Sequence, residues 1–151
     1  MSDIPTASSR PATGAHALAV DLRMLASQLR RRLRQEASAA DWTESQRNVL
    51  MRLERQDGAT VTELATAEGV RSQSMGATVA ALVEAGYVEG RADPADGRRT
   101  LLSLTALSRQ LIRQVRAARE DWLQHTIEAR YSPAEQKQLA GAVQLLQRLL
   151  D

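Results

Sequence analysis

The sequence predicts a mainly α-helical protein with one small β-hairpin. Apolar residues recur at spacings of three and four in several segments, which is the periodicity of amphipathic helices. Residues that favour helix starts precede several of these segments. One stretch, residues 88–104, instead holds two short β-prone segments around a turn-rich loop. A chain of 151 residues with 43% hydrophobic content is the size of one domain with its own core.

Composition excludes several classes of protein. The chain has no cysteine, so disulfides, thiolate metal sites and cysteine nucleophiles are ruled out. No apolar run approaches the roughly 18 residues of a membrane span, and the start lacks an apolar signal core. We therefore expect a cytoplasmic protein without a membrane partner. The formal net charge is only +2, although 19 of the 20 basic residues are arginines, which suit phosphates and guanine edges.

The N-terminal part divides into an arm and a first helix. Residues 1–14 contain little to bury and predict a disordered arm. A helix over about residues 15–36 follows, because leucines share one face and arginines lie off it. The leucines are Leu18, Leu22, Leu25, Leu29 and Leu33, and the arginines are Arg23, Arg30, Arg31, Arg32 and Arg34. A solvated face is the favoured interpretation of the arginine run.

The next segments predict three helices. Thr43 and Gln46 form a capping box at the start of the first, which buries an apolar face. Thr62 and Ser72 are expected to cap two short helices that meet at Gly69. In the last helix the expected core face is Met75, Val79, Leu82 and Val83, and the outward face is Ser72, Gln73, Gly76 and Ala77.

That outward face is small and uncharged. It fits a DNA major groove, where Gln can pair with adenine and Ala can touch a thymine methyl. A plain helical hairpin packed in a core is the alternative interpretation of these two helices.

The segments Tyr87–Arg91 and Thr100–Leu104 predict two strands joined by the loop DPADG. A hairpin directly after two short helices is the order of a winged helix-turn-helix, here over about residues 43–105. Arg98 would reach the minor groove or its phosphates from the wing tip. Asp96 is spaced to hold that guanidinium. The alternative is an ordinary solvated hairpin tip.

The stretch VTELATAEGVRSQSMGATVAALVEAGYVEGRADPADGRRTLLSLT resembles the MarR family of bacterial transcriptional regulators. The resemblance extends from about residue 16 to the end of the chain. Family members usually show Asp-x-Arg-Asp-x-Arg-Arg in the wing, and this sequence matches except at the first arginine. The corresponding positions hold Asp93, Ala95, Asp96, Arg98 and Arg99, with Ala95 in place of the first arginine.

This resemblance implies roles for individual residues. It implies that Arg98 makes the DNA contact at the wing tip and that Asp96 orients this arginine. Arg99 would face either a phosphate or only solvent. On the recognition helix it implies sequence reading by Ser72, Gln73 and Ser74, beside Gly76 and Ala77, with Arg71 as a phosphate partner.

The C-terminal third predicts two more helices, the first capped by Thr105 and the second begun by Ser132, Pro133 and Glu135. With the first helix they carry more apolar surface than one winged unit needs, so a second copy would cover it. The resemblance implies the same, with dimerisation helices over about residues 15–36 and 106–151. The expected interface residues are Leu18, Leu22, Leu25, Trp122, Leu139, Val143, Leu146 and Leu150.

The prediction is a homodimeric, sequence-specific DNA-binding regulator of one domain over residues 15–151. We expect a repressor that binds a pseudo-palindrome of roughly 16 to 20 base pairs. The resemblance implies release by a small aromatic or lipophilic effector, for which Trp42 and Arg47 are weak candidates. Isolated His16 and His125 predict no metal site, and no cofactor is expected.

An enzyme is not expected, because the sequence lacks a nucleophile and base at recognisable spacing and a Gly-rich phosphate loop. One alternative stays open: a helical interaction protein that keeps the winged shape but does not bind DNA. The missing wing arginine at Ala95 and the bland pair Gly76 and Ala77 keep this alternative open.

Overall fold

The computed structural model describes residues 14–37 and 40–151. The predicted N-terminal arm, except for Gly14, lies outside the described residues. The chain divides into two compact units, one up to Glu36 and the other from Ala37 to Asp151.

The first unit holds one long helix, α1 (Ala15–Glu36). Its leucine periodicity agrees with the predicted helix, yet α1 has no buried residue. Leu18 is 53% exposed and Leu25 is 59% exposed. The helix therefore presents an apolar stripe that the chain itself leaves in contact with solvent.

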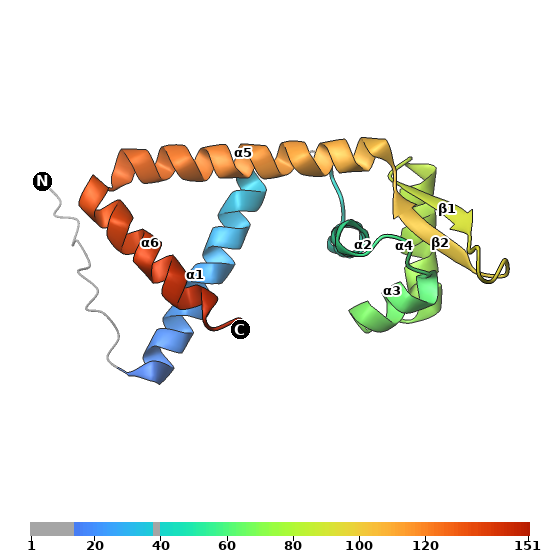
Figure 1. The fold of residues 1–151 in the computed structure, drawn as a ribbon, viewed down its shortest axis with the longest axis horizontal. Coiled ribbons are helices and arrows are strands. Elements are labelled where there is room, and N and C mark those ends of the chain that lie inside the picture. The colour runs from blue at the N-terminus through green and yellow to red at the C-terminus, as the bar shows by residue number, and fades with distance from the viewer. Residues whose placement is uncertain (1–13, 38–39) are drawn as a thin grey trace, which may run out of the picture. The chain divides into compact units, whose positions relative to one another are not determined.

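The second unit contains five helices and a two-stranded antiparallel sheet within the described residues (Figure 1). In chain order they are α2 (Glu44–Arg55), α3 (Val61–Glu68), α4 (Ser72–Glu84), β1 (Val88–Ala92), β2 (Thr100–Leu104), α5 (Ala106–Arg130) and α6 (Pro133–Gln147). The mainly helical fold with a small wing is thus confirmed. The described part of the chain has no helix long and apolar enough to cross a membrane.

The predicted caps are right for three helices. Thr43 forms a capping box with Gln46 at the start of α2, and Ser132 forms one with Glu135 at the start of α6. Thr105 caps α5 by accepting a hydrogen bond from the N–H of Ser108.

The predicted cap of α3 is wrong, because Thr60 and not Thr62 occupies that position. The Thr60 hydroxyl accepts from the N–H of Glu63 at 3.2 Å, and a Glu63 carboxylate oxygen accepts from the N–H of Thr60 at 2.8 Å. A reciprocal box needs an acidic or amide residue three positions after the cap, and only Thr60 has one. Thr62 therefore lies inside the helix.

The predicted cap of α4 is also displaced, since Arg71 is the N-cap and Ser72 is the first helical residue. Gly69 ends α3 in the left-handed conformation with φ of +65°, which glycine adopts readily. The N–H of Val70 then bonds to the carbonyl of Ala65 at 3.0 Å. This tight turn uses one residue fewer than a Ser72 cap would require.

The β-hairpin begins one residue later than predicted, at Val88 rather than Tyr87. In its register Val88 faces Leu104 and Ala92 faces Thr100. A β-carbon on Gly90 would lie 2.8 Å from the Thr100 methyl, so a larger residue there would force the Thr100 side chain to move.

One hydrophobic core holds α2, α3, α4, the hairpin and the start of α5 together. It is made by Val49, Leu50, Leu53, Ala59, Leu64, Ala65, Met75, Val79, Leu82, Val88, Leu102, Leu104 and Ile112. Val83 was expected on this face but is 45% exposed. A helix turns about 100° per residue, so the neighbour of buried Leu82 points away from the core.

Helix α5 is fixed to the core at its start only. Its two buried residues, Ser108 and Ile112, both lie in the first two turns. The Ser108 hydroxyl donates to the carbonyl of Tyr87 at 2.6 Å, and Arg116 donates to both carboxylate oxygens of Glu54 at 2.8 and 2.9 Å. Helix α6 has no buried residue at all.

Candidate nucleic-acid interface

Helix α4 turns one face to the core and the opposite face to solvent. Met75, Val79 and Leu82 are buried. The predicted DNA-facing residues Arg71, Ser72, Gln73, Ser74 and Ala77 are exposed, and Gly76 is partly exposed. Apart from Arg71 at the N-cap, these exposed side chains are small or uncharged. Such a face can approach base edges without a charge to desolvate.

Hydrogen bonds between side chains and main chain shape the wing tip. The N–H of Asp93 bonds to the carbonyl of Arg99, and the N–H of Arg99 bonds to the carbonyl of Asp96, both at 2.9 Å. The Asp93 carboxylate accepts from the N–H of Ala95 at 2.9 Å. These bonds give the loop a defined path.

Asp96 does not hold the guanidinium of Arg98, contrary to the expectation from sequence. Its carboxylate accepts from the main-chain N–H of Arg98 at 3.1 Å. A short Asp side chain reaches the N–H two residues on more readily than a distant side-chain tip, which is the geometry of an Asx turn. Asp96 therefore shapes the backbone at the tip.

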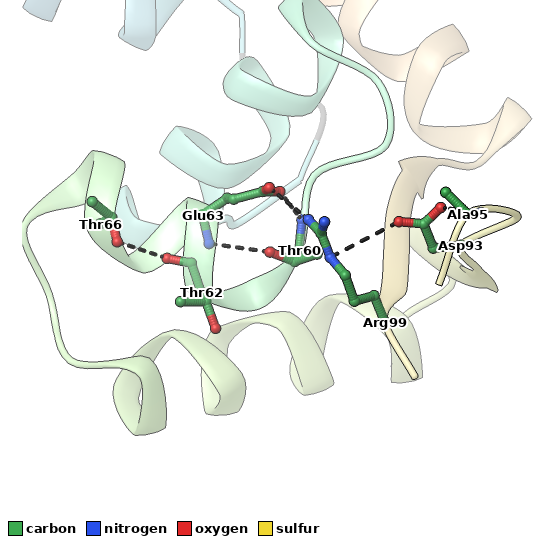
Figure 2. A network of polar contacts seen from close by, with 7 residues as sticks. All are labelled: Thr60, Thr62, Glu63, Thr66, Asp93, Ala95 and Arg99. Atoms are coloured by element: carbon green, nitrogen blue, oxygen red, sulfur yellow. Dashed lines mark hydrogen bonds and ion pairs between the residues drawn. The ribbon is translucent and has the colours of Figure 1, made fainter. Parts of the chain in front are cut away.

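The two adjacent wing arginines have different surroundings. Arg99 Nη2 lies 2.7 Å from Glu63 Oε1 at the start of α3, and Arg99 Nε lies 3.9 Å from Asp93 Oδ2 (Figure 2). Arg98 is exposed, and across residues 14–37 and 40–151 no hydrogen bond or ion pair involves its guanidinium. Of these two guanidinium groups, that of Arg99 is paired and that of Arg98 has no partner among the described residues.

Hydrogen bonds and the charge of Arg99 favour the ionised form of Glu63. The main-chain N–H and the hydroxyl of Thr60 lower the pKa of Glu63 below its ordinary value, and the positive charge of Arg99 lowers it further. Glu63 therefore stays ionised at neutral pH.

An open hollow of about 510 Å³ lies between the start of α3 and the wing. It is lined by Thr60, Val61, Thr62, Glu63, Arg98, Arg99 and Thr100.

Trp42 and Arg47, the weak effector candidates, are close together. Trp42 packs against the core and meets Tyr87 edge-to-face, with ring centroids 5.4 Å apart. Arg47 Nη2 donates to the carbonyl of Trp42 at 3.0 Å. The indole N–H of Trp42 is buried and has no hydrogen-bond partner in the described part of the chain.

The expected dimer residues share incomplete burial. The exposed ones are Leu18, Leu25, Leu139, Val143, Leu146 and Leu150, and the partly exposed ones are Leu22 and Trp122.

Among the described residues no group of three or more His, Cys, Asp or Glu side chains could hold a metal ion. The ring of His125 instead contacts the carbonyl of Asp121 at 2.7 Å.

Comparison with known proteins agrees with this geometry. Residues 41–99 match the model of the MarR family. An HTH-type transcriptional regulator of Mycobacterium bovis is 32% identical over 134 residues, which cover 89% of this chain and 93% of that protein. The chain belongs to the MarR family. As a MarR-family transcriptional regulator it is a DNA-binding protein, and its relatives are regulators rather than enzymes.

Solved structures share the MarR fold. A transcriptional regulator of Pseudomonas aeruginosa superposes with a TM-score of 0.80 at 37% identity, over 93% of this chain and 99% of that one. MepR of S. aureus bound to an oligodeoxyribonucleotide gives 0.68 at 20% identity, over 89% and 98% of the two chains. MepR bound to ethidium bromide gives 0.60 at 21% identity, over 88% and 96%.

Sequence reasoning about this MarR protein missed Glu63. It was not among the predicted site residues, although its ion pair with Arg99 is what makes the surroundings of the two wing arginines different. The capping box of Thr60 and Glu63 was readable from a spacing of three. The contact with Arg99, which is 36 residues away in sequence, had no local signal.

Proposed function

We propose that the protein is a homodimeric repressor that places α4 in the major groove and Arg98 at the minor groove of a pseudo-palindromic operator. The observation that carries this proposal is the exposed, uncharged face of α4 beside an unpaired wing arginine. MepR, which has the same fold, has been solved with an oligodeoxyribonucleotide bound. The site of action would be the bacterial cytoplasm.

Base reading would rest on the first turns of α4. Gln73 is exposed there and can bond to the N6 and N7 edge of adenine, a contact that discriminates by about 1–3 kcal/mol. Ala77 offers a methyl group to thymine. Ser72 and Ser74 are exposed at the helix start and would read bases beside Gln73, whereas exposed Arg71 can donate to phosphate oxygens.

Homodimerisation would cover the apolar faces of α1 and α6. Neither helix has a buried residue, although both carry leucines at helical spacing. Apolar surface gains about 25 cal/mol per Å² when it leaves water, so these faces favour association. A twofold dimer presents two copies of α4, and half-sites about one DNA turn apart would match them.

Effector release would act at Trp42 and Arg47. A small aromatic or lipophilic compound could pack against the Trp42 ring, and a carboxylate on it could pair with Arg47, whose Nη2 donates to the Trp42 carbonyl. MepR, the same fold, has been solved with ethidium bromide. An effector that prefers a dimer whose α4 spacing does not match the operator would shift the population away from the DNA-bound state.

The test is fluorescence anisotropy with labelled duplex from the region around the protein's own gene. Titrations at several salt concentrations, with unrelated competitor DNA, separate specific from electrostatic binding. We expect competitor-resistant binding by a dimer, which sedimentation confirms independently. A protein that dimerises but binds no tested promoter in the presence of competitor would instead be the winged interaction protein.

A further inference from the structure

We infer that Glu63 is a positioning residue for DNA binding, because its ion pair with Arg99 fixes the wing to α3 and leaves Arg98 as the arginine that reaches DNA. This inference rests on the proposed function of the wing. It assigns to Arg99 an anchoring role in place of a DNA contact.

The positions of the partners place the pair at the base of the wing. Asp93 directly follows β1, and Arg99 directly precedes β2. The Arg99 guanidinium lies 2.7 Å from Glu63 on α3 and 3.9 Å from Asp93 across the loop (Figure 2). One side chain therefore closes the loop and also ties it to the helix-turn-helix.

Glu63 is itself held in place. Its Oε2 atom accepts from the main-chain N–H of Thr60, and its Oε1 atom accepts from Arg99. The capping box fixes the carboxylate relative to the start of α3, so the ion pair transmits that position to the wing. Both partners are about half exposed, so the pair adds little to folding stability. Its effect should appear in DNA binding.

The pair also explains how a carboxylate can lie beside the proposed DNA surface. Unpaired, Glu63 would repel phosphates across the hollow that it shares with Arg98. Arg99 neutralises it. Removing Arg99 would therefore cost affinity through a loosened wing and an uncovered negative charge, and removing both partners should cost no more.

The experiment compares Glu63→Gln, Arg99→Ala, the double variant and Arg98→Ala. Gln keeps the capping box, because its amide oxygen can still accept from Thr60. The matched control is Glu135→Gln, which removes the same charge from the capping box of α6, where no arginine of residues 14–37 or 40–151 pairs with the carboxylate. Thermal unfolding checks that each variant folds.

Two readouts are needed. Amide hydrogen exchange without DNA should be faster at Asp93 and Arg99 in Glu63→Gln and Arg99→Ala. DNA affinity should fall about threefold to fivefold in each single variant, and the double should fall no further than the worse single. The slope of log affinity against log salt should stay the same in these variants and drop by about one in Arg98→Ala. The control Glu135→Gln should change none of these.

Other outcomes would overturn the inference. Unchanged wing exchange in Glu63→Gln means that the pair does not anchor the wing, and this result holds even if the wild type binds no DNA. Tighter DNA binding by Glu63→Gln, or a salt slope in Arg99→Ala reduced as much as in Arg98→Ala, means that Arg99 contacts phosphate. If the wild type did not bind DNA in the presence of competitor, the proposed function would be wrong. Amide hydrogen exchange would still show whether the ion pair anchors the wing.

Discussion

The core around α2, α3 and α4 differs from helices α1 and α6 in how it uses apolar residues. Every core residue of the described chain lies between Val49 and Ile112, whereas α1 and α6 bury none. Both regions carry leucines at helical spacing. The first region buries its apolar residues within one chain, whereas neither α1 nor α6 has a buried residue. Amphipathic periodicity therefore indicates that a helix has an apolar face to bury, but it does not indicate whether the same chain or another molecule buries it.

Charge divides the chain in a related way. Residues 15–36 carry five arginines against Asp21 and Glu36, a formal charge of +3. Residues 37–151 carry fourteen basic and fifteen acidic side chains, a formal charge of −1. The winged unit therefore cannot attract DNA through net charge. Its affinity must come from where individual arginines are placed, which is why the partners of Arg98 and Arg99 matter.

The largest effect should follow a cavity in the core. Leu50→Ala removes a fully buried side chain and should lower the free energy of unfolding by about 2–5 kcal/mol. Leu145→Ala, at a leucine that is 63% exposed on α6, is the matched control and should change the stability of the monomer little. Urea unfolding at low protein concentration measures both. Equal losses would mean that α6 belongs to the same core.

A smaller change in stability but a clear change in assembly should follow polar substitution on α6. Val143→Ser with Leu146→Ser should shift the protein from dimer to monomer in sedimentation experiments. The winged unit should keep its hydrogen-exchange protection, since neither residue belongs to its core. An unchanged dimer would place the interface elsewhere.

Arg98→Ala should weaken specific DNA binding by about 1–3 kcal/mol while the dimer remains intact. The reason is that Arg98 is exposed and makes no ion pair in the part of the chain that the structure describes. Anisotropy titration measures the loss, and Arg113→Ala, at an exposed arginine of α5, controls for the removal of one charge. Equal losses of affinity in both variants would mean that Arg98 contributes only its positive charge and makes no specific contact with DNA.

Gly76→Ala should separate folding from function. A β-carbon there would meet no other part of the described chain within 4 Å beyond the neighbouring backbone of its own helix, and alanine stabilises a helix interior by up to about 1 kcal/mol relative to glycine. We expect a higher melting temperature together with weaker specific DNA binding, because the added methyl lies on the proposed DNA face. Higher stability with unchanged binding would show that α4 does not approach DNA at Gly76.

The smallest effect concerns acid. Hydrogen bonds from the caps lower the pKa of both Glu63 and Glu135 in the folded protein. Because the pKa is lower in the folded protein, the ionised carboxylate stabilises the fold at pH values above its ordinary pKa of about 4.5. This stabilisation is lost as the pH falls through the lower pKa of the folded state. The deficit of Glu63→Gln and Glu135→Gln against wild type should therefore shrink between pH 5 and acid, measured by thermal unfolding. A deficit independent of pH would argue against ionised caps.

The sequence by itself determined the helices, the hairpin and the family. Capping boxes such as Thr43 with Gln46 and Ser132 with Glu135 act over three residues, so they can be read directly. Apolar periodicity likewise reports which side of α4 is buried. These signals are local, and the structure agrees with them except at two helix starts and at Val83.

Only the tertiary structure decided what the individual side chains do. Thr60 and not Thr62 caps α3, and Asp96 bonds to the main chain and not to a guanidinium. Arg98 and Arg99 look equivalent in sequence, and they differ because folding brings Glu63, 36 residues earlier, against one of them. Such long-range contacts depend on how the turn at Gly69 and the hairpin register place whole elements, so no spacing along the chain encodes them.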